Sequence, residues 1–204
     1  IISTSHFPRM SLFPILPKIL EQQKTKPVQD KNLPMNITDQ EAVNRWILEK
    51  MGFDFSMGTL DVSVHPFCGG AGADVRLTTR YRDTDWCRSF YGVMHEGGHG
   101  LYEQGMESFA AHPALREAPS FGMHESQSRF WENQIGRHPG FCEWLVTELR
   151  EQGRIDRSWS GERLSRYVNQ VQPSYIRVEA DEITYQLHIL LRFELEKALV
   201  NGDI

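Results

Sequence analysis

The chain has 204 residues, of which 40% are hydrophobic and 11% aromatic, and its formal net charge is −5. This composition predicts one ordinary hydrophobic core and excludes the disordered and fibrous classes of protein. Lys and Arg are dispersed among Asp and Glu, so no basic stripe indicates a nucleic-acid partner. No apolar run approaches the roughly 18 residues that cross a bilayer, which predicts that the protein has no membrane partner.

Residues 1–36 are expected to form an N-terminal helical segment and a linker. Ser11–Gln23 predicts a short helix interrupted by Pro14 and Pro17, and the polar Gln22–Pro34 indicates a linker or an exposed loop. The first ten residues lack the order of a secretory signal. The chain also opens without a Met, which favours a fragment.

The pattern becomes regular after residue 36. Thr38–Glu41 resembles a helix start, and apolar residues then repeat at helical spacing until Gly52. Residues 60–80 instead alternate apolar and polar side chains on either side of Gly69–Gly72, which predicts two strands joined by a glycine-rich connection. The three cysteines are Cys68, Cys87 and Cys142, and their odd number without a C-x-x-C spacing predicts reduced thiols in a cytoplasmic protein.

The next predicted helix runs from Asp85 to about Tyr102, with Thr84 or Asp83 as its N-cap and Gly105 as its end. Its apolar stripe consists of Trp86, Phe90, Val93, Met94 and Leu101. Winding the sequence at about 100° per residue places two histidines on the opposite side of the helix. This polar side contains His95 and His99, beside Arg88, Tyr91 and Tyr102.

Further helices are predicted over Ser120–Ile135, Phe141–Gln152, Leu164–Val171 and Tyr175–Val200. In the first of them, one face carries Glu125, Ser128, Arg129 and Glu132, and the other carries Met123, Phe130 and Trp131. In the last, the polar face carries Arg177, Asp181, Tyr185, His188 and Arg192. The sequence therefore predicts a mainly α fold with one small β-sheet.

The helix over residues 85–102 carries His95-Glu96-Gly97-Gly98-His99, which matches the zinc-peptidase motif H-E-x-x-H. On a helix both histidines can reach one metal ion, and Glu96, about 100° around the helix, can hold the attacking water. The two adjacent glycines cost the helix on the order of 2 kcal/mol relative to Ala. We expect that another backbone or a substrate strand approaches this turn closely, and poor helix stability is the alternative.

A catalytic zinc typically takes three protein ligands, so a third must come from elsewhere in the chain. Tyr102 and Gly105 stand where the metzincin class requires Gly and His, which excludes that class. A carboxylate from a separate helix is the other common solution. Glu125 is the favoured candidate, since the preceding loop is long enough to bring its helix against the first. The competing candidates are Glu103, Glu107, Glu117 and Glu132.

Peptide hydrolysis at such a site needs a base, oxyanion donors and groups that hold the substrate. Glu96 is the expected general base, and Tyr175, Tyr185 and His188 are possible donors. An enzyme acting at a C-terminus must also hold a free carboxylate, for which Arg177 is the favoured residue. The alternative for Arg177 is an i,i+4 ion pair with Asp181 on a solvated helix.

Five motifs occur in one order: His65-Pro66-Phe67, Asp74-Val75-Arg76-Leu77-Thr78-Thr79, His95-Glu96-Gly97-Gly98-His99, His124-Glu125-Ser126-Gln127 and Ile176-Arg177-Val178-Glu179-Ala180-Asp181. Together they resemble the thermostable carboxypeptidase family, the carboxypeptidase Taq metallopeptidases. The resemblance covers residues 37–204 and, more weakly, 11–36. It implies that residues 37–204 form a metallocarboxypeptidase catalytic region with a neurolysin-like, cleft-forming helical fold.

The resemblance also implies the chemistry of the site. Zinc or cobalt is expected on His95, His99 and Glu125, with Glu96 as the base. The expected substrates are peptides with a free C-terminus, and the full-length form is expected to be a homodimer. His65 is expected to border the cleft, although a structural hydrogen bond at a strand end is an alternative for it.

The sequence departs from the family in three respects. Family members are longer, with a larger N-terminal helical region and a downstream motif G-x-x-Q-D-x-H-W, so truncation at both ends is expected. Gly97 stands where a bulkier residue is usual. Two alternatives to a carboxypeptidase therefore stay open: an endo-acting oligopeptidase, and a catalytically incompetent fragment that serves as a metal-binding or interaction subunit.

Overall fold

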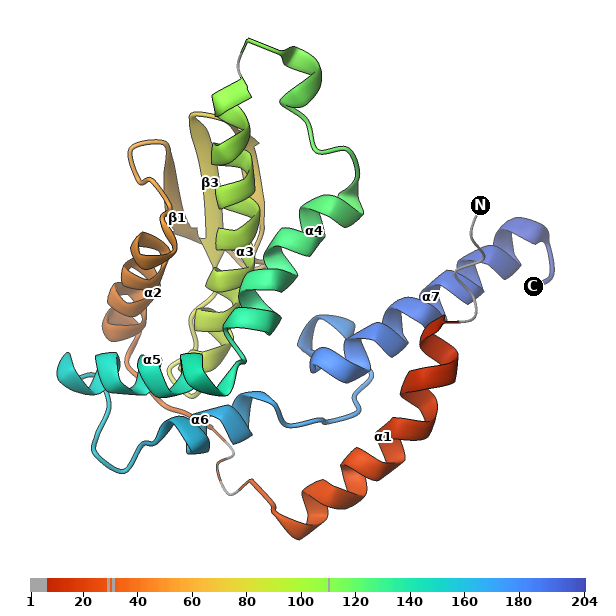
Figure 1. Ribbon diagram of the computed structural model, residues 1–204, viewed down its shortest axis with the longest axis horizontal. Helices are drawn as coiled ribbons and strands as arrows, with labels where there is room; N and C mark the ends of the chain where they lie inside the picture. The colour runs from red at the N-terminus through yellow and green to blue at the C-terminus, as the bar shows by residue number, and fades with distance from the viewer. Residues whose placement is uncertain (1–6, 29, 31, 110) are drawn as a thin grey trace. The chain divides into compact units, whose positions relative to one another are not determined.

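The computed structural model describes residues 7–28, 30, 32–109 and 111–204 (Figure 1). The helices are α1 (Phe7–Thr25), α2 (Ile37–Met51), α3 (Trp86–Met106), α4 (Phe121–Arg129), α5 (Pro139–Glu151), α6 (Gly161–Val168) and α7 (Glu182–Asn201). The strands are β1 (Gly58–Val62), β2 (Cys68–Ala71) and β3 (Asp74–Thr79). The predicted mainly α fold with a small sheet is confirmed. Within the described ranges, no helix combines the length and the hydrophobicity needed to cross a membrane.

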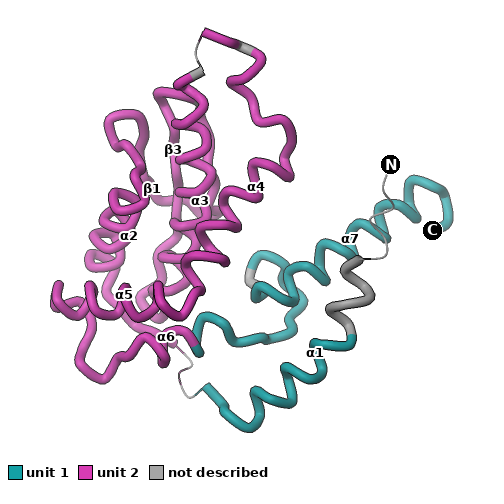
Figure 2. Tube along the Cα trace, viewed as in Figure 1, with its two compact units in different colours: residues 1–29, 166–204 teal, residues 30–165 magenta. Residues whose placement is uncertain are grey.

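The chain divides into two compact units (Figure 2). Residues 1–29 and 166–204 form the first, and residues 30–165 form the second. In the first unit α1 contacts α7. There the side chain of Gln23 donates to the carbonyl of Val171 at 2.9 Å and accepts from its N–H at 2.7 Å. The expected boundary between residues 36 and 37, which separates the N-terminal segment from the catalytic region, stays a prediction.

Helix α2 has the ends that its sequence encodes. Asn36 caps it by accepting a hydrogen bond from the N–H of Asp39 at 2.9 Å, and Gly52 ends it with a φ of 99°. The polar segment before it was predicted to be a linker or an exposed loop, and most of its described residues are exposed. Leu33 is an exception, since it is 1% exposed and its carbonyl accepts a hydrogen bond from the N–H of Trp86.

The sheet has three strands in the order β1-β3-β2, and its glycine-rich part differs from the prediction. Strand β1 pairs parallel to β3, and β2 pairs antiparallel to β3 with Ala71 opposite Asp74. Most of the run Gly69–Gly72, expected to be a connection, instead belongs to strand β2, and only Gly72 lies outside it. The two-residue turn after β2 begins with Gly72, whose φ of 56° lies in the left-handed region. Glycine content alone was therefore a misleading guide, because an edge strand such as β2 tolerates glycine beside a turn that requires it.

Helix α3 is the central element of the second unit. Asp85 caps it by accepting from the N–H of Cys87 at 3.2 Å, and the predicted apolar residues Phe90, Val93 and Met94 are fully buried. The helix continues past Gly105 to Met106, so the predicted end was too early. Side chains are buried around much of its circumference because α3 contacts the sheet, α2 and α4 (Figure 1).

Tyr91 shows how far this burial extends. It was expected on the polar side of α3 with the histidines, yet it is 4% exposed. Its hydroxyl donates to the carbonyl of Gly136 at 3.0 Å, which satisfies the polar group at the end of a buried ring. A stacked pair, Trp46 on α2 and Trp144 on α5, lies at the edge of the same core with ring centroids 5.4 Å apart.

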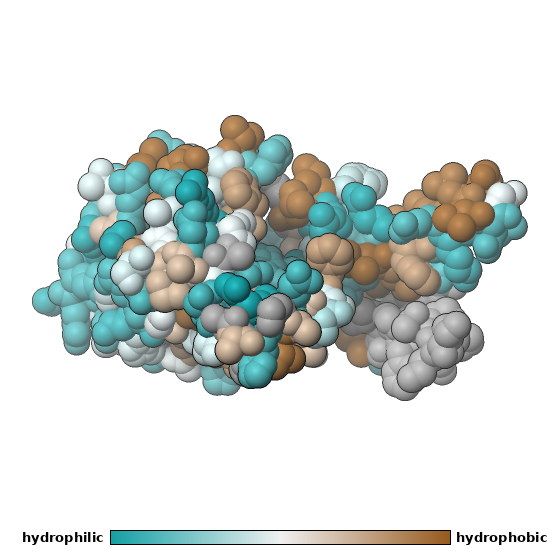
Figure 3. All heavy atoms as spheres, turned by 90° about the horizontal axis from the view of Figure 1, so that it is seen from above, coloured by the Kyte–Doolittle hydropathy of each residue, from teal (hydrophilic) through white to brown (hydrophobic). Residues whose placement is uncertain are grey.

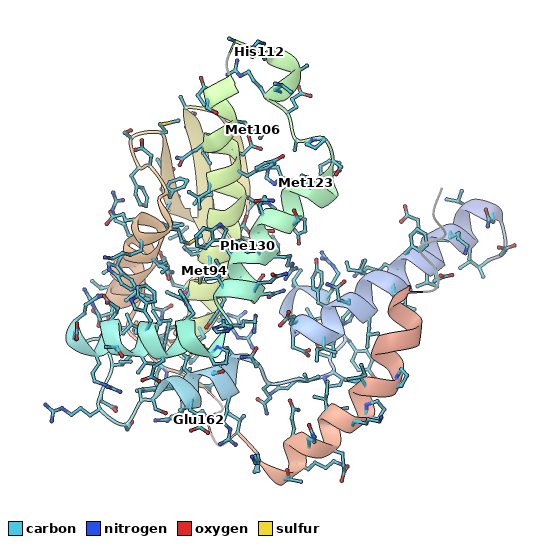
Figure 4. All side chains as sticks on the ribbon, viewed as in Figure 1. Met94, Met106, His112, Met123, Phe130 and Glu162 are labelled. Atoms are coloured by element: carbon cyan, nitrogen blue, oxygen red, sulfur yellow. The ribbon has the colours of Figure 1, made fainter. Side chains whose placement is uncertain are left out.

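Helix α4 begins where the sequence predicted but does not continue as one α-helix. Ser120 caps it by accepting from the N–H of Met123 at 3.1 Å, and residues 130–135 then form a π-helical segment. Met123 and Phe130 are 45% and 46% exposed, so they do not form the buried face expected of them. They lie along α4 and its continuation (Figure 4). The face that α4 turns toward α3 is instead the polar one.

The predicted helix over Tyr175–Val200 is broken near its start. Residues 177–179 form a 3-10 turn, Ala180 is extended, and α7 begins only at Glu182. Asp181 causes the break by accepting hydrogen bonds from the N–H groups of Ile183 and Thr184, which makes it an N-cap. Several apolar side chains of α7 are exposed (Figure 3): Ile189, Leu191, Phe193, Leu195, Leu199 and Val200.

All three cysteines are free, as predicted. Burial and the nearby carboxylates Glu96 and Glu103 raise the pKa of Cys68 to about 12, and burial also raises the pKa values of Cys87 and Cys142. The reactive thiolate is therefore scarce at pH 8. We expect iodoacetamide to leave the native, metal-free protein unmodified and to add three groups in denaturant, as measured by intact mass. A rapid adduct at Cys68 in the native protein would contradict this expectation.

Candidate metal centre

His95 and His99 project from one side of α3, and their side chains are 18% and 15% exposed. Their rings meet edge to face with centroids 4.9 Å apart. Glu125 reaches the same point from α4, since its Oε2 lies 3.6 Å from Nε2 of His95 and 3.2 Å from Nε2 of His99. One ligand atom from each of the three residues lies within 4.8 Å of the others. The three residues predicted from the sequence as metal ligands are thus brought together.

The two adjacent glycines of α3 allow two different helices to pack closely, α4 at Gly98 and α2 at Gly97. A Cβ at Gly98 would lie 2.7 Å from both the carbonyl oxygen of Gln127 and Cα of Ser128. A Cβ at Gly97 would lie 2.6 Å from a methyl group of Leu48 on α2. The expected close approach of another backbone is confirmed at Gly98, and that backbone belongs to the helix that carries Glu125.

The charge of Glu125 suits a cation. Burial opposes its ionisation, but a hydrogen bond from His99 and the positive charges of His95 and Arg129 outweigh burial and lower the pKa of Glu125 to about 2. Arg129 donates from Nε to Oε1 of Glu125 at 3.0 Å, so the other oxygen, Oε2, is the one that faces the histidines. Two imidazoles and one carboxylate are the donor set of known catalytic zinc sites, so these residues fit a divalent metal.

Glu132, a competitor for the third-ligand position, engages the far side of His95. Its Oε2 lies 2.9 Å from Nδ1 of His95, on the ring nitrogen away from Glu125. Arg129 and Arg137 donate to its two oxygens at 2.9 and 3.2 Å. Burial opposes the charge, but the hydrogen bond and charge of His95 and the two arginines lower the pKa of Glu132 to about 2. The carboxylate therefore supports His95 and stays ionised.

The other competitors are engaged elsewhere or exposed. Glu103 lies 2.7 Å from Nε2 of His124, Glu107 pairs with Arg116 at 2.9 Å, and Glu117 is exposed. Sequence reasoning gave His124 no role, yet its Nδ1 lies 2.5 Å from Nδ1 of His99. Its place beside Glu125 on one helix was the available signal, but the contact depends on how α4 packs on α3.

Glu96 is buried beside this cluster, with 8% of its surface exposed. Burial raises the pKa of its carboxyl, the charges of His95 and His99 act in the opposite direction, and the negative charge of Glu125 raises it further. A carboxylate with a raised pKa is a stronger proton acceptor. The arrangement can therefore combine a divalent cation with a neighbouring base.

Three of the residues predicted to bind substrate lie in the first unit. Arg177 donates to the hydroxyl of Tyr185 at 2.8 Å, and Nε2 of His188 lies 3.0 Å from the carbonyl oxygen of Ser174. The i,i+4 ion pair considered for Arg177 is replaced by this contact, since Asp181 caps α7. His65 belongs to the second unit and is exposed between β1 and β2. A substrate-binding role for these four residues stays a prediction.

The chain matches known proteins over almost all of its length. Residues 7–204 match the family model described as carboxypeptidase Taq (M32) metallopeptidase. Thermostable carboxypeptidase 1 of Pyrococcus furiosus is 42% identical over 95% of this chain and 39% of its own length. Thermostable carboxypeptidase 1 of Thermus thermophilus is 41% identical over 93% of this chain and 38% of its own length. The chain thus spans about two fifths of the length of these relatives.

Solved structures agree with this match. Metallocarboxypeptidase 1 of Trypanosoma cruzi has a TM-score of 0.89 and 40% identity, covering 96% of this chain and 40% of that chain. A Pyrococcus furiosus carboxypeptidase has a TM-score of 0.86 and 43% identity over the same shares of the two chains. Identity at this level over nearly the whole chain shows more than a common fold. The chain belongs to the carboxypeptidase Taq (M32) metallopeptidase family.

Proposed function

We propose that the protein carrying this chain is a metal-dependent carboxypeptidase that removes residues from the C-termini of peptides. The observation that carries the proposal is the convergence of His95, His99 and Glu125 on one point beside the buried carboxyl of Glu96. Family membership supports it, since the relatives are named carboxypeptidases.

The metal in this proposal is zinc, held by Nε2 of His95, Nε2 of His99 and Oε2 of Glu125. Zinc is favoured because two imidazoles and one carboxylate are a donor set that catalytic zinc sites use. Cobalt accepts the same donors and is the second candidate. When bound, the metal polarises the scissile carbonyl and lowers the pKa of water at the site toward about 7.

Glu96 moves the proton. Its carboxylate oxygen accepts a proton from the attacking water and returns it to the nitrogen of the leaving amine. Its burial raises its pKa and so strengthens it as a base. Glu96 stands next to a ligand in sequence yet points about 100° away around α3, so it acts on the water without occupying a ligand position.

The remaining predicted residues are proposed to hold the substrate. Arg177 binds the free C-terminal carboxylate through its planar guanidinium, and Tyr185 and His188 donate to the developing oxyanion. The hydrogen bond between Arg177 and Tyr185 supports a shared role, because it places the cation and a phenolic donor together. His65 is proposed to border the peptide near the sheet.

Blocked substrates test the reaction class. We expect the full protein to hydrolyse a peptide with a free C-terminus, and to leave the same peptide intact when its C-terminus is amidated, as followed by mass spectrometry. Equal cleavage of both peptides would favour the endo-acting oligopeptidase. Metal binding without hydrolysis of either peptide would favour a metal-binding or interaction subunit.

Removal of the metal provides an independent prediction. Prolonged dialysis against 1,10-phenanthroline is expected to abolish hydrolysis, because His95, His99 and Glu125 alone cannot polarise the carbonyl. Stoichiometric Zn²⁺ or Co²⁺ should restore it, and Mg²⁺ should restore it far less because it prefers oxygen ligands. The measurement is activity against metal content. Full activity in metal-free protein would contradict the proposal.

Two further predictions concern the whole protein. The homodimer is tested by light scattering across a range of protein concentrations. The cytoplasmic location, which rests on the three free cysteines, is tested by fractionating cells that make the protein.

A further inference from the structure

Both histidines of the candidate metal centre have a support on the ring nitrogen that faces away from Glu125, but the two supports differ. For His95 the support is direct, because the carboxylate of Glu132 contacts its Nδ1. For His99 it has two steps, because Nδ1 contacts a second imidazole, His124, which in turn contacts a carboxylate, Glu103. The second arrangement is the less expected, since two imidazole nitrogens meet and only one of them can carry a proton.

The geometry of the two-step chain is tight throughout. Nδ1 of His99 lies 2.5 Å from Nδ1 of His124, and Nε2 of His124 lies 2.7 Å from Oε1 of Glu103. The side chains of His124 and Glu103 are 21% and 18% exposed, so the chain is largely shielded from water. The rings of Tyr102 and His124 meet edge to face with centroids 5.3 Å apart, which restricts rotation of the imidazole.

Only one placement of protons satisfies every contact in this chain while a metal is bound. A metal on Nε2 of His99 leaves the proton of that ring on Nδ1, which must then donate to Nδ1 of His124. Nδ1 of His124 is therefore the acceptor, and its ring carries its proton on Nε2. That proton is donated to the carboxylate of Glu103. The chain thus runs in one direction, from the metal-facing imidazole to a carboxylate.

We propose that His124 and Glu103 are positioning residues that hold His99 in the tautomer and ring orientation with Nε2 toward the metal. This inference rests on the proposed function and deepens it. Partners of ligand histidines fix the tautomer and raise the basicity of the ligand, and losing one typically lowers metal affinity about 10- to 100-fold. Helix α4 then supplies both Glu125, which is a ligand, and His124, which supports the ligand His99.

The spacing of these residues explains why the chain forms. Glu103 follows His99 by four residues on α3, so both lie on one side of the helix one turn apart. His124 enters between them from α4, with its ring 4.6 Å from that of His99 and tilted by 38°. The approach of α4 at Gly98 is what brings it within reach.

Two variants of one residue separate positioning from packing. His124→Asn keeps a side-chain oxygen near the place of Nδ1 that can accept from His99, whereas His124→Leu keeps bulk and offers no acceptor. We expect zinc affinity of the full protein, measured by competition with a chelating dye, to fall about 10- to 100-fold in His124→Leu. His124→Asn should recover most of this loss. His112 is an exposed histidine at the far tip of the same unit (Figure 4), and His112→Leu should bind zinc like the wild type.

A spectroscopic readout tests the tautomer itself. In ¹⁵N-labelled zinc protein the Nδ1–H of His99 should give a protected imidazole resonance, assigned by its loss in His99→Ala. That resonance should persist in His124→Asn and disappear through solvent exchange in His124→Leu. Glu103→Gln keeps an acceptor oxygen but loses the charge, so it should retain the resonance with a smaller loss of affinity.

The possible results are distinguishable. Wild-type protein that binds neither zinc nor cobalt would defeat the proposed function itself. Wild-type protein that binds zinc, together with a His124→Leu variant of unchanged affinity, would overturn the positioning role and leave the proposed function intact. Equal losses in His124→Leu and His124→Asn with the His99 resonance retained would assign His124 to packing alone and would also overturn it. Circular dichroism of each variant checks that it is folded.

Discussion

Replacing Glu96 by Gln is expected to lower kcat of the full protein about 10²- to 10⁴-fold while leaving the metal bound. The amide has nearly the same size and fills the same buried position on α3, but it cannot accept a proton from water. The two histidines and Glu125 are untouched, so metal content should equal that of the wild type. The measurement is kcat on a peptide with a free C-terminus, together with metal content by mass spectrometry.

The stability of this variant separates chemistry from folding. Burial raises the pKa of Glu96, so ionising it in the metal-free protein costs folding free energy once the pH rises above the pKa of the unfolded chain. Gln carries no charge and avoids that cost. The metal-free variant should therefore be at least as stable as the wild type at pH 7, and it should lose no stability between pH 4 and 7 through this position.

A matched control keeps the interpretation simple. Glu117→Gln makes the same chemical change at an exposed position of the loop before α4, and it should leave kcat unchanged. If Glu96→Gln retains more than a tenth of wild-type kcat with full metal content, another group accepts the proton. If it loses the metal as well, Glu96 has a structural role that the burial alone does not account for.

The metal motif was readable from the sequence because it is local. Helical winding fixes how His95, Glu96 and His99 face one another. The cap of α3 was misplaced by one or two residues, since Asp85 caps the helix where Thr84 or Asp83 was expected. Glu125 was favoured among five carboxylates but not determined, since its choice depends on how two helices separated by a loop pack together. That packing is a long-range property, and no local periodicity encodes it.

The supports of the histidines were missed for the same reason. Glu132 was noted only as a competing ligand, and His124 had no assigned role. Which ring nitrogen each contacts depends on how α4 and the π-helical segment after it pack against α3. The prediction for the last helix failed for a different reason. Its apolar periodicity continued through Ala180, but the local hydrogen bonds of Asp181 compete with the helix and end it. Periodicity reports which face is buried, and it does not report where a cap interrupts the backbone.

Replacing Gly98 by Ala is expected to damage both stability and metal binding, although Ala is the better helix former. The new Cβ would lie 2.7 Å from backbone atoms of Gln127 and Ser128, which cannot rotate away as a side chain can. Helix α4 must move back, at a cost of about 1–3 kcal/mol for an overpacked contact. The same movement withdraws Glu125 from His95 and His99, and ligand distances tolerate only about 0.2 Å. We expect a lower Tm and a loss of zinc affinity of about tenfold or more.

Two other glycines of α3 provide controls for this substitution. A Cβ at Gly92 or Gly105 would meet no atom within 4 Å, so Ala there only improves helix propensity. Each should raise stability by up to about 1 kcal/mol, or about 2–4 °C in Tm, without changing zinc affinity. The opposite signs at Gly98 and Gly105 would show that the helix tolerates Ala and that the backbone of α4 does not. Gly98→Ala could instead behave like the controls. The backbone of α4 would then lie farther from Gly98 than the contact of 2.7 Å implies, and Glu125 would lose its place as the third ligand.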